Sequence, residues 1–169
     1  MRFRGFGLVP GFEGATVKYN KIVDTMNGDP VVQELLAAPI PARLAYIGKD
    51  GAPRAIPVSY LWNGRAFVFA SPVTWAKVEA LRLEPRVALT VDETTFPPRG
   101  FMARGTASVE IVQGVPQEYV EASRRIVGDE LMPSWEAEVR SKVHEMALIT
   151  ITPTWLKVVD FETRFPGPS

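Results

Sequence analysis

Cysteine is absent from this chain, and histidine occurs once, as His144. Without thiols the protein has no disulfide scaffold, no thiol catalysis and no thiolate zinc or iron–sulfur site. A single histidine also excludes a metal centre built from several imidazoles, so we predict no metal site. A chain of 169 residues buries roughly 70% of its unfolded surface on folding, so it needs no covalent or metal support.

An excess of one charge and a long apolar run are missing as well. The 19 basic and 19 acidic side chains cancel, which argues against a protein that binds nucleic acid through its overall field. The longest uncharged apolar run, residues 66–76, is about half the roughly 20 residues that a membrane helix needs. Glycine and proline interrupt the N-terminal residues too early for a secretory signal. We therefore expect a cytoplasmic protein with no membrane or nucleic-acid partner.

The motifs of several enzyme classes are also missing. A serine–histidine–acid triad would have to use His144, which lies at the end of an expected helix, and no nucleophile-elbow sequence occurs. Neither a phosphate-binding P-loop nor a dinucleotide-binding glycine motif is present. The sequence therefore assigns no catalytic residue.

Turn residues divide the chain into short elements. Asp50-Gly51 and Asn63-Gly64 predict two tight hairpin turns, because both positions of such turns favour positive φ. Asp29 and Pro30 predict a helix start that Pro39 ends. We expect strands at residues 43–49, 54–62, 65–70, 86–92, 101–112, 146–152 and 155–161, and further helices at residues 74–83, 116–127 and 133–144.

This order predicts a mainly β fold with added helices, a six- to seven-stranded antiparallel barrel, because helices do not alternate with strands. Gly105 is the expected bend in its longest strand. We assign residues 29–165 to a single domain, residues 1–28 to an N-terminal arm and lead-in, and residues 166–169 to a tail. Within the arm, residues 1–16 are expected to be irregular.

An anion site is expected where the third strand meets the next helix. Ser71 offers a hydroxyl, Thr74 is placed to cap the helix, and Lys77 lies one turn further on. The unpaired N–H groups of a first helical turn favour a phosphate there. The alternative interpretation is that Thr74 is only a cap and Lys77 a solvated surface residue.

The second strand offers a wall for the same site. Pro57 donates no ladder hydrogen bond and indicates an edge or opening in the sheet. A flat aromatic ligand could lie against the backbone of Pro57, Val58 and Ser59. A packed core face is the alternative.

Ordered segments of the chain resemble a known family. The run RLAYIGKDGAP is followed in order by IPV, FAS, TWAKVEALRLEPRVAL and RGTA; these segments occupy residues 43–53, 56–58, 69–71, 74–89 and 104–107. They resemble the pyridoxamine 5′-phosphate oxidase-like, FMN-binding split β-barrel family. The resemblance implies a homodimer with two shared cofactor sites, taking FMN or, as the alternative, the deazaflavin coenzyme F-420.

In that family the positions of Ser71, Thr74 and Lys77 hold the phosphate, and the strand at 57–59 lines the ring system. Trp75 stands where the family often has arginine, and it could stack on the ring or the substrate. Ala80 stands where asparagine is common. Residues 155–165 contain no histidine, so the Arg-x-His signature of pyridoxamine phosphate oxidases is missing and that reaction is not expected.

We therefore predict a flavin- or deazaflavin-dependent oxidoreductase that acts on a small molecule the sequence does not identify. Arg104 could meet a substrate carboxylate or the partner's cofactor, or be a solvated surface residue. One alternative is a carrier that holds flavin, deazaflavin or haem without turnover. A barrel that stacks single-stranded nucleic acid on its aromatic residues is a second alternative, which the neutral charge disfavours.

Overall fold

The structure, a computed structural model, describes residues 12–94 and 96–164. Its helices are α1 (Phe12–Gly28), α2 (Pro30–Ala37), α3 (Ala76–Leu83), α4 (Gln117–Val127) and α5 (Met132–Lys142). Its strands are β1 (Ala42–Ile47), β2 (Pro53–Val58), β3 (Leu61–Trp62), β4 (Phe67–Pro72), β5 (Arg86–Asp92), β6 (Arg99–Gln113) and β7 (Glu145–Asp160). Within these described ranges, no helix is long and apolar enough to cross a membrane.

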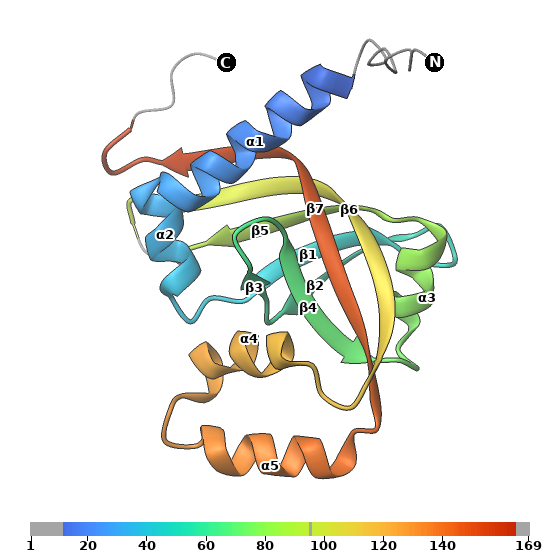
Figure 1. Cartoon of the computed structure of the whole chain (residues 1–169). Coiled ribbons are helices and arrows are strands. Elements are labelled where there is room, and N and C mark those ends of the chain that lie inside the picture. The colour runs from blue at the N-terminus through green and yellow to red at the C-terminus, as the bar shows by residue number, and fades with distance from the viewer. Residues whose placement is uncertain (1–11, 95, 165–169) are drawn as a thin grey trace, which may run out of the picture.

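All seven strands belong to one antiparallel sheet, in the order β2-β1-β5-β6-β7-β4-β3. The sheet curls around an apolar core, with α1 and α2 at one end, α4 and α5 at the other, and α3 at the side (Figure 1). The prediction of a mainly β fold with added helices is confirmed.

Local sequence signals account for several elements. The Asp29 carboxylate caps α2 by accepting hydrogen bonds from the backbone N–H groups of Val31 and Val32. In β6, Phe101 and Ala103 are buried while Arg104 is exposed. This period of two places one face of β6 in the core and the other in solvent.

The strand expected at residues 54–62 is two strands. β2 pairs with β1 at one edge of the sheet, and β3 pairs with β4 at the other edge. Between them the chain turns at Ser59 and Tyr60, and the Tyr60 ring is buried. Trp62 then packs on Phe67, with ring centroids 4.9 Å apart. Burial of Tyr60 and packing of Trp62 on Phe67 therefore accompany the interruption of the single strand that the local pattern predicts.

The strands expected at residues 146–152 and 155–161 are one continuous strand, β7. Its pairing with β6 shifts register at Gly105, and Thr154 is the extra residue of a bulge. A Cβ on Gly105 would lie 2.5 Å from the Thr152 carbonyl oxygen, so only glycine fits there. Pro153 lies at this bulge, which lets the strand continue through a residue that lacks an N–H.

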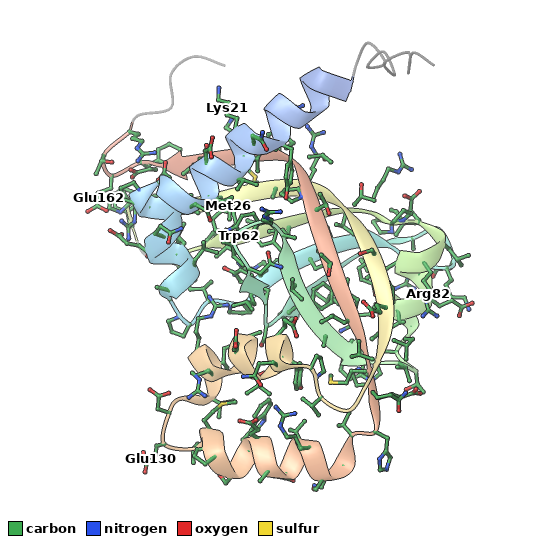
Figure 2. All side chains as sticks on the ribbon, in the orientation of Figure 1. Lys21, Met26, Trp62, Arg82, Glu130 and Glu162 are labelled. Atoms are coloured by element: carbon green, nitrogen blue, oxygen red, sulfur yellow. The ribbon has the colours of Figure 1, made fainter. Side chains whose placement is uncertain are left out.

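Helix α1 corrects the expectation that residues 1–16 are irregular, since residues 12–16 are helical; residues 1–11 lie outside the described part of the chain. The Trp62 indole Nε1–H donates to Asn27 Oδ1 at 2.7 Å, and the Tyr19 hydroxyl donates to the Arg65 carbonyl at 2.9 Å. Met26 is fully buried on the barrel side of α1 (Figure 2). Packing on the barrel stabilises this helix, which has no strong start signal of its own.

Candidate functional site

A hollow of about 170 Å³ lies where β4 ends and α3 begins, and we call it the Lys77 hollow. The end of β2, the end of β4, the start of α3 and one face of α4 surround it. Its lining residues are Pro57, Val58, Ser59, Phe69, Ala70, Ser71, Pro72, Trp75, Lys77, Tyr119 and Ser123.

Most of the residues predicted to bind a cofactor line this one hollow. They come from β2 and the turn after it (Pro57, Val58 and Ser59), from β4 (Ser71), and from the start of α3 (Trp75 and Lys77). The structure therefore brings the end of β2 beside the junction between β4 and α3, as a shared site at these residues requires.

Thr74 is the exception among the predicted phosphate residues. It is exposed and does not line the Lys77 hollow. The N-cap position of α3 is Trp75, and no side chain caps the helix. The prediction that Thr74 caps this helix was wrong: α3 begins at Ala76, two residues after the expected start at 74, and its N-cap position is Trp75.

Ser71 brings an unused hydroxyl to the hollow. Ser71 is 1% exposed, and its Oγ has no hydrogen-bond partner among residues 12–94 and 96–164. A buried polar group left without a partner costs about 1–3 kcal/mol. A ligand oxygen in the hollow would remove that cost, so Ser71 favours a polar ligand.

Lys77 brings a desolvated cation to the same hollow. The residue is 8% exposed, and burial lowers its pKa, with no neighbouring charge in the described part of the chain offsetting the shift. Its Nζ lies 4.4 Å from the centroid of the Trp75 ring, which gives partial compensation through a cation–π contact. The hollow therefore offers positive charge and a hydroxyl to an anion, as a phosphate requires.

Helix α4 contributes two lining residues that sequence reasoning missed. Tyr119 and Ser123 lie four residues apart on one face of α4 and border the hollow. Burial raises the pKa of the Tyr119 hydroxyl, and the Tyr119 ring packs on Trp135 of α5 at 5.6 Å. The four-residue spacing of Tyr119 and Ser123 is visible in the sequence. Which strand ends α4 covers is set by packing between distant segments, so the sequence did not show that these two residues reach the hollow.

Arg125, also on α4, fixes one wall of the hollow and was likewise missed. Its guanidinium donates to the backbone carbonyl oxygens of Leu36, Ala38 and Tyr60. It also lies over the Tyr60 ring, 4.7 Å from the centroid. Because Tyr60 follows Ser59 directly, these bonds hold the turn that carries the ring-binding residues predicted at 57–59.

Arg104 and His144 both lie away from the hollow. Arg104 is exposed on β6, and its guanidinium lies 4.7 Å from the centroid of the Trp155 ring. His144 is exposed after the end of α5. Within the described ranges, no cluster of histidine, aspartate and glutamate could hold a metal ion.

Solved structures share this fold at low sequence identity. An F420 reductase is 23% identical, with a TM-score of 0.58, over 74% of this chain and 94% of that one. A conserved hypothetical protein from Mycobacterium tuberculosis is 20% identical, with a TM-score of 0.56, over 100% and 96%. The haem storage protein HutZ from Vibrio cholerae is 14% identical, with a TM-score of 0.55, over 77% and 93%.

No curated protein matches the chain. The sequence model of the pyridoxamine 5′-phosphate oxidase family, however, matches residues 29–160, which include every strand and the whole Lys77 hollow. Together with the seven-stranded antiparallel barrel, this match shows that the chain belongs to the pyridoxamine 5′-phosphate oxidase-like family of split β-barrels.

Proposed function

We propose that the protein is an oxidoreductase that uses a phosphorylated flavin or deazaflavin and acts on a small molecule in the cytoplasm. One observation carries the proposal: the buried Lys77 and the Ser71 hydroxyl, which has no hydrogen-bond partner among the described residues, line the same hollow of about 170 Å³. FMN is the first candidate, and the deazaflavin coenzyme F-420 is the alternative.

The phosphate end of the cofactor would lie between β4 and α3. Lys77 would supply the charge, while Ser71 of β4 and Ser123 of α4 would supply hydroxyl donors. Charge-assisted hydrogen bonds strengthen where water is excluded. With Trp75 in place of the family's arginine, Lys77 is the only cation among the lining residues, so we expect FMN to bind less tightly than at a site with two cations.

The ring system would extend from this hollow along Pro57, Val58 and Ser59. At about 170 Å³, the hollow is smaller than the roughly 300–1,000 Å³ of ordinary small-molecule sites. It therefore accommodates one end of the cofactor and leaves the ring to be covered by another surface. Trp75, 55% exposed, and the unpaired edge of β2 are available for that contact. We propose that a second copy of the chain covers the ring, giving a homodimer with two shared sites.

A bound flavin or deazaflavin would supply the hydride or electron transfer itself. The chain would hold the phosphate, orient the ring against β2 and keep water out. No lining residue of the hollow is a carboxylic acid or a histidine, so the chain's own contribution at this site is placement rather than proton transfer.

A carrier without turnover is the alternative function, and the structural likeness to a haem storage protein supports it. Haem held by histidine does not fit the Lys77 hollow, since His144 lies elsewhere. A flavin or deazaflavin carrier would use the hollow in the same way as the enzyme.

Absorbance of the purified protein tests these proposals. Loaded with FMN or with F-420, an oxidoreductase should lose its visible band on addition of a nicotinamide nucleotide or other reductant and regain it with an electron acceptor. A chromophore that binds and never cycles would establish the carrier instead. Failure to bind either cofactor would overturn both, and sedimentation as a monomer would overturn the shared site.

A further inference from the structure

A second concave site lies between α1 and β7, and we call it the α1–β7 groove. It encloses about 350 Å³, which is within the size range of ordinary small-molecule sites. Helix α1 contributes Lys18, Lys21, Ile22 and Thr25, and β7 contributes Trp155, Leu156 and Val158.

This groove is distant from the Lys77 hollow of the same chain. Ser71 pairs with Ala147, near the start of β7, whereas the groove begins at Trp155 on that strand. Eight residues of extended chain span about 25 Å. Figure 1 accordingly places α1 and α4 at opposite ends of the barrel. A flavin phosphate in the hollow therefore cannot occupy the groove of its own chain.

The floor of the groove is apolar and its wall is aromatic. Ile22 is buried, and Leu156 and Val158 are half-buried against the barrel core. The half-buried Trp155 forms one wall and is held in place by Arg104, whose guanidinium lies 4.7 Å from the ring centroid. These surfaces favour a flat, apolar ligand body.

The rim of the groove is positive. Lys18 and Lys21 are exposed, and Lys21 extends from α1 toward solvent (Figure 2). No carboxylate among the described residues forms an ion pair with either of them or with Arg104. Because Lys18, Lys21 and Ile22 follow helical spacing, both ammonium groups stand above the apolar floor on one face of α1.

We propose that the α1–β7 groove binds an organic anion with a flat aromatic body, an aromatic carboxylate. The body lies on Ile22 and Leu156 beside the Trp155 ring, and the carboxylate meets the lysine ammonium groups at the rim. An inorganic anion would leave the apolar floor uncovered, and a neutral aromatic compound would leave the two charges unused. The proposal does not depend on flavin binding at the hollow.

Calorimetric titration of the full chain with naphthoate tests the proposal. We expect saturable binding, and at least tenfold weaker binding of naphthamide, which has the same shape without the charge. The double variant Lys18→Gln/Lys21→Gln should weaken naphthoate binding at least tenfold. Lys157→Gln, an exposed lysine of β7 that does not line the groove, should change it less than threefold.

Trp155→Ala should abolish saturable binding, and Trp155→Phe should restore most of it if the wall acts through its ring. Thermal unfolding of each variant separates lost binding from lost fold. Equal affinities for naphthoate and naphthamide, or an unchanged affinity in the double lysine variant, would overturn the proposal. Lys77→Met should leave naphthoate binding intact, so failure at the groove is distinguishable from failure of the flavin proposal.

Discussion

The Lys77 hollow and the α1–β7 groove both use lysine, but they place it in different surroundings. Lys77 is buried beside an unpartnered hydroxyl, whereas Lys18 and Lys21 stand in solvent above an apolar floor. A buried cation attracts an anion strongly, because the surrounding dielectric constant is low. Water and salt weaken the attraction between an exposed cation and an anion. The hollow is therefore suited to hold a compact charge, and the groove to hold an apolar body that carries a charge.

The two sites also differ in how their walls are fixed. Arg125 binds three backbone carbonyl oxygens and so joins α4 to the turn that borders the hollow. The groove lies between α1 and β7. Side-chain contacts, such as the hydrogen bond from Trp62 to Asn27, hold α1 against the barrel. Substitutions that act on the wall of one site should therefore leave the other site unchanged.

The largest effect is expected for Arg125→Met. Loss of the guanidinium leaves the carbonyl oxygens of Leu36 and Tyr60 without these hydrogen-bond donors. Each unsatisfied buried group costs about 1–3 kcal/mol of stability. We expect a destabilisation of about 3 kcal/mol in denaturant unfolding and weaker FMN binding at the hollow. Arg124→Met is the matched control, because Arg124 is half-exposed and its ion pair is with exposed Asp129; it should cost less than about 1 kcal/mol. Equal costs for the two variants would contradict the role of Arg125.

Lys77→Met should separate the two sites most clearly in binding. Removing the charge while keeping the length should weaken FMN binding by about 2 kcal/mol, the scale of a hydrogen bond to a charged group. The unliganded protein should melt at a slightly higher temperature, because a desolvated charge is gone. Fluorescence titration and thermal unfolding measure the two effects. Lys21→Met is the control, and FMN affinity that falls equally in both variants would remove the phosphate from the hollow.

Ser71→Ala, like Lys77→Met, is expected to lower FMN affinity without lowering the stability of the unliganded protein, and the effect on affinity should be smaller. The variant loses one donor to the phosphate, worth about 1 kcal/mol of FMN affinity, and it also removes a buried hydroxyl that has no partner in the unliganded protein. Stability should therefore stay level or rise. Ser108→Ala, at an exposed position of β6, should change neither measurement. A clear loss of stability in Ser71→Ala would show that the hydroxyl serves the fold.

The smallest effect at neutral pH concerns the proton on Lys77. Burial lowers its pKa, so the folded protein holds this proton less tightly than the unfolded chain does. Stability of the unliganded protein should rise with pH from the lowered pKa up to the ordinary lysine value. FMN affinity should fall over the same alkaline range, as the ammonium is lost. Lys77→Arg should keep its affinity there, and matching pH profiles for the two proteins would contradict the assignment.

Local patterns were sufficient for much of the fold and for the centre of the site. The cap at Asp29 and the alternation along β6 each depend on residues close in sequence, and each is present in the structure. The chain also turns at Asp50-Gly51, but the loop spans residues 48–52 and Gly51 alone has positive φ there, so the expectation of positive φ at both turn positions was wrong. The shared position of Ser71 and Lys77 beside one hollow was predicted in the same way, because a strand end and a helix start follow directly on each other; that they bind a cofactor stays a prediction.

The remaining features depend on contacts between distant segments. The separation of β2 from β3 follows from the burial of Tyr60. The wall of the hollow depends on Arg125, which binds the Tyr60 carbonyl from a position 65 residues further along the chain. Tyr119 and Ser123 reach the hollow only because α4 packs across the end of the barrel (Figure 1). No periodicity within α4 reports which strands that helix will cover.

The extra residue at Thr154 compensates for a reversal of the sequence pattern along β7. Before the bulge, Ile151 and Pro153 face the core; beyond it, Leu156 and Val158 do so, and the parity of the strand is reversed. Because Pro153 pairs with Gly105 and Trp155 with Arg104, deleting Thr154 would make the β6–β7 ladder regular, with Trp155 still facing outward and Leu156 still facing the core. This one position of β7 can therefore lose a residue without turning over the side chains on either side of it.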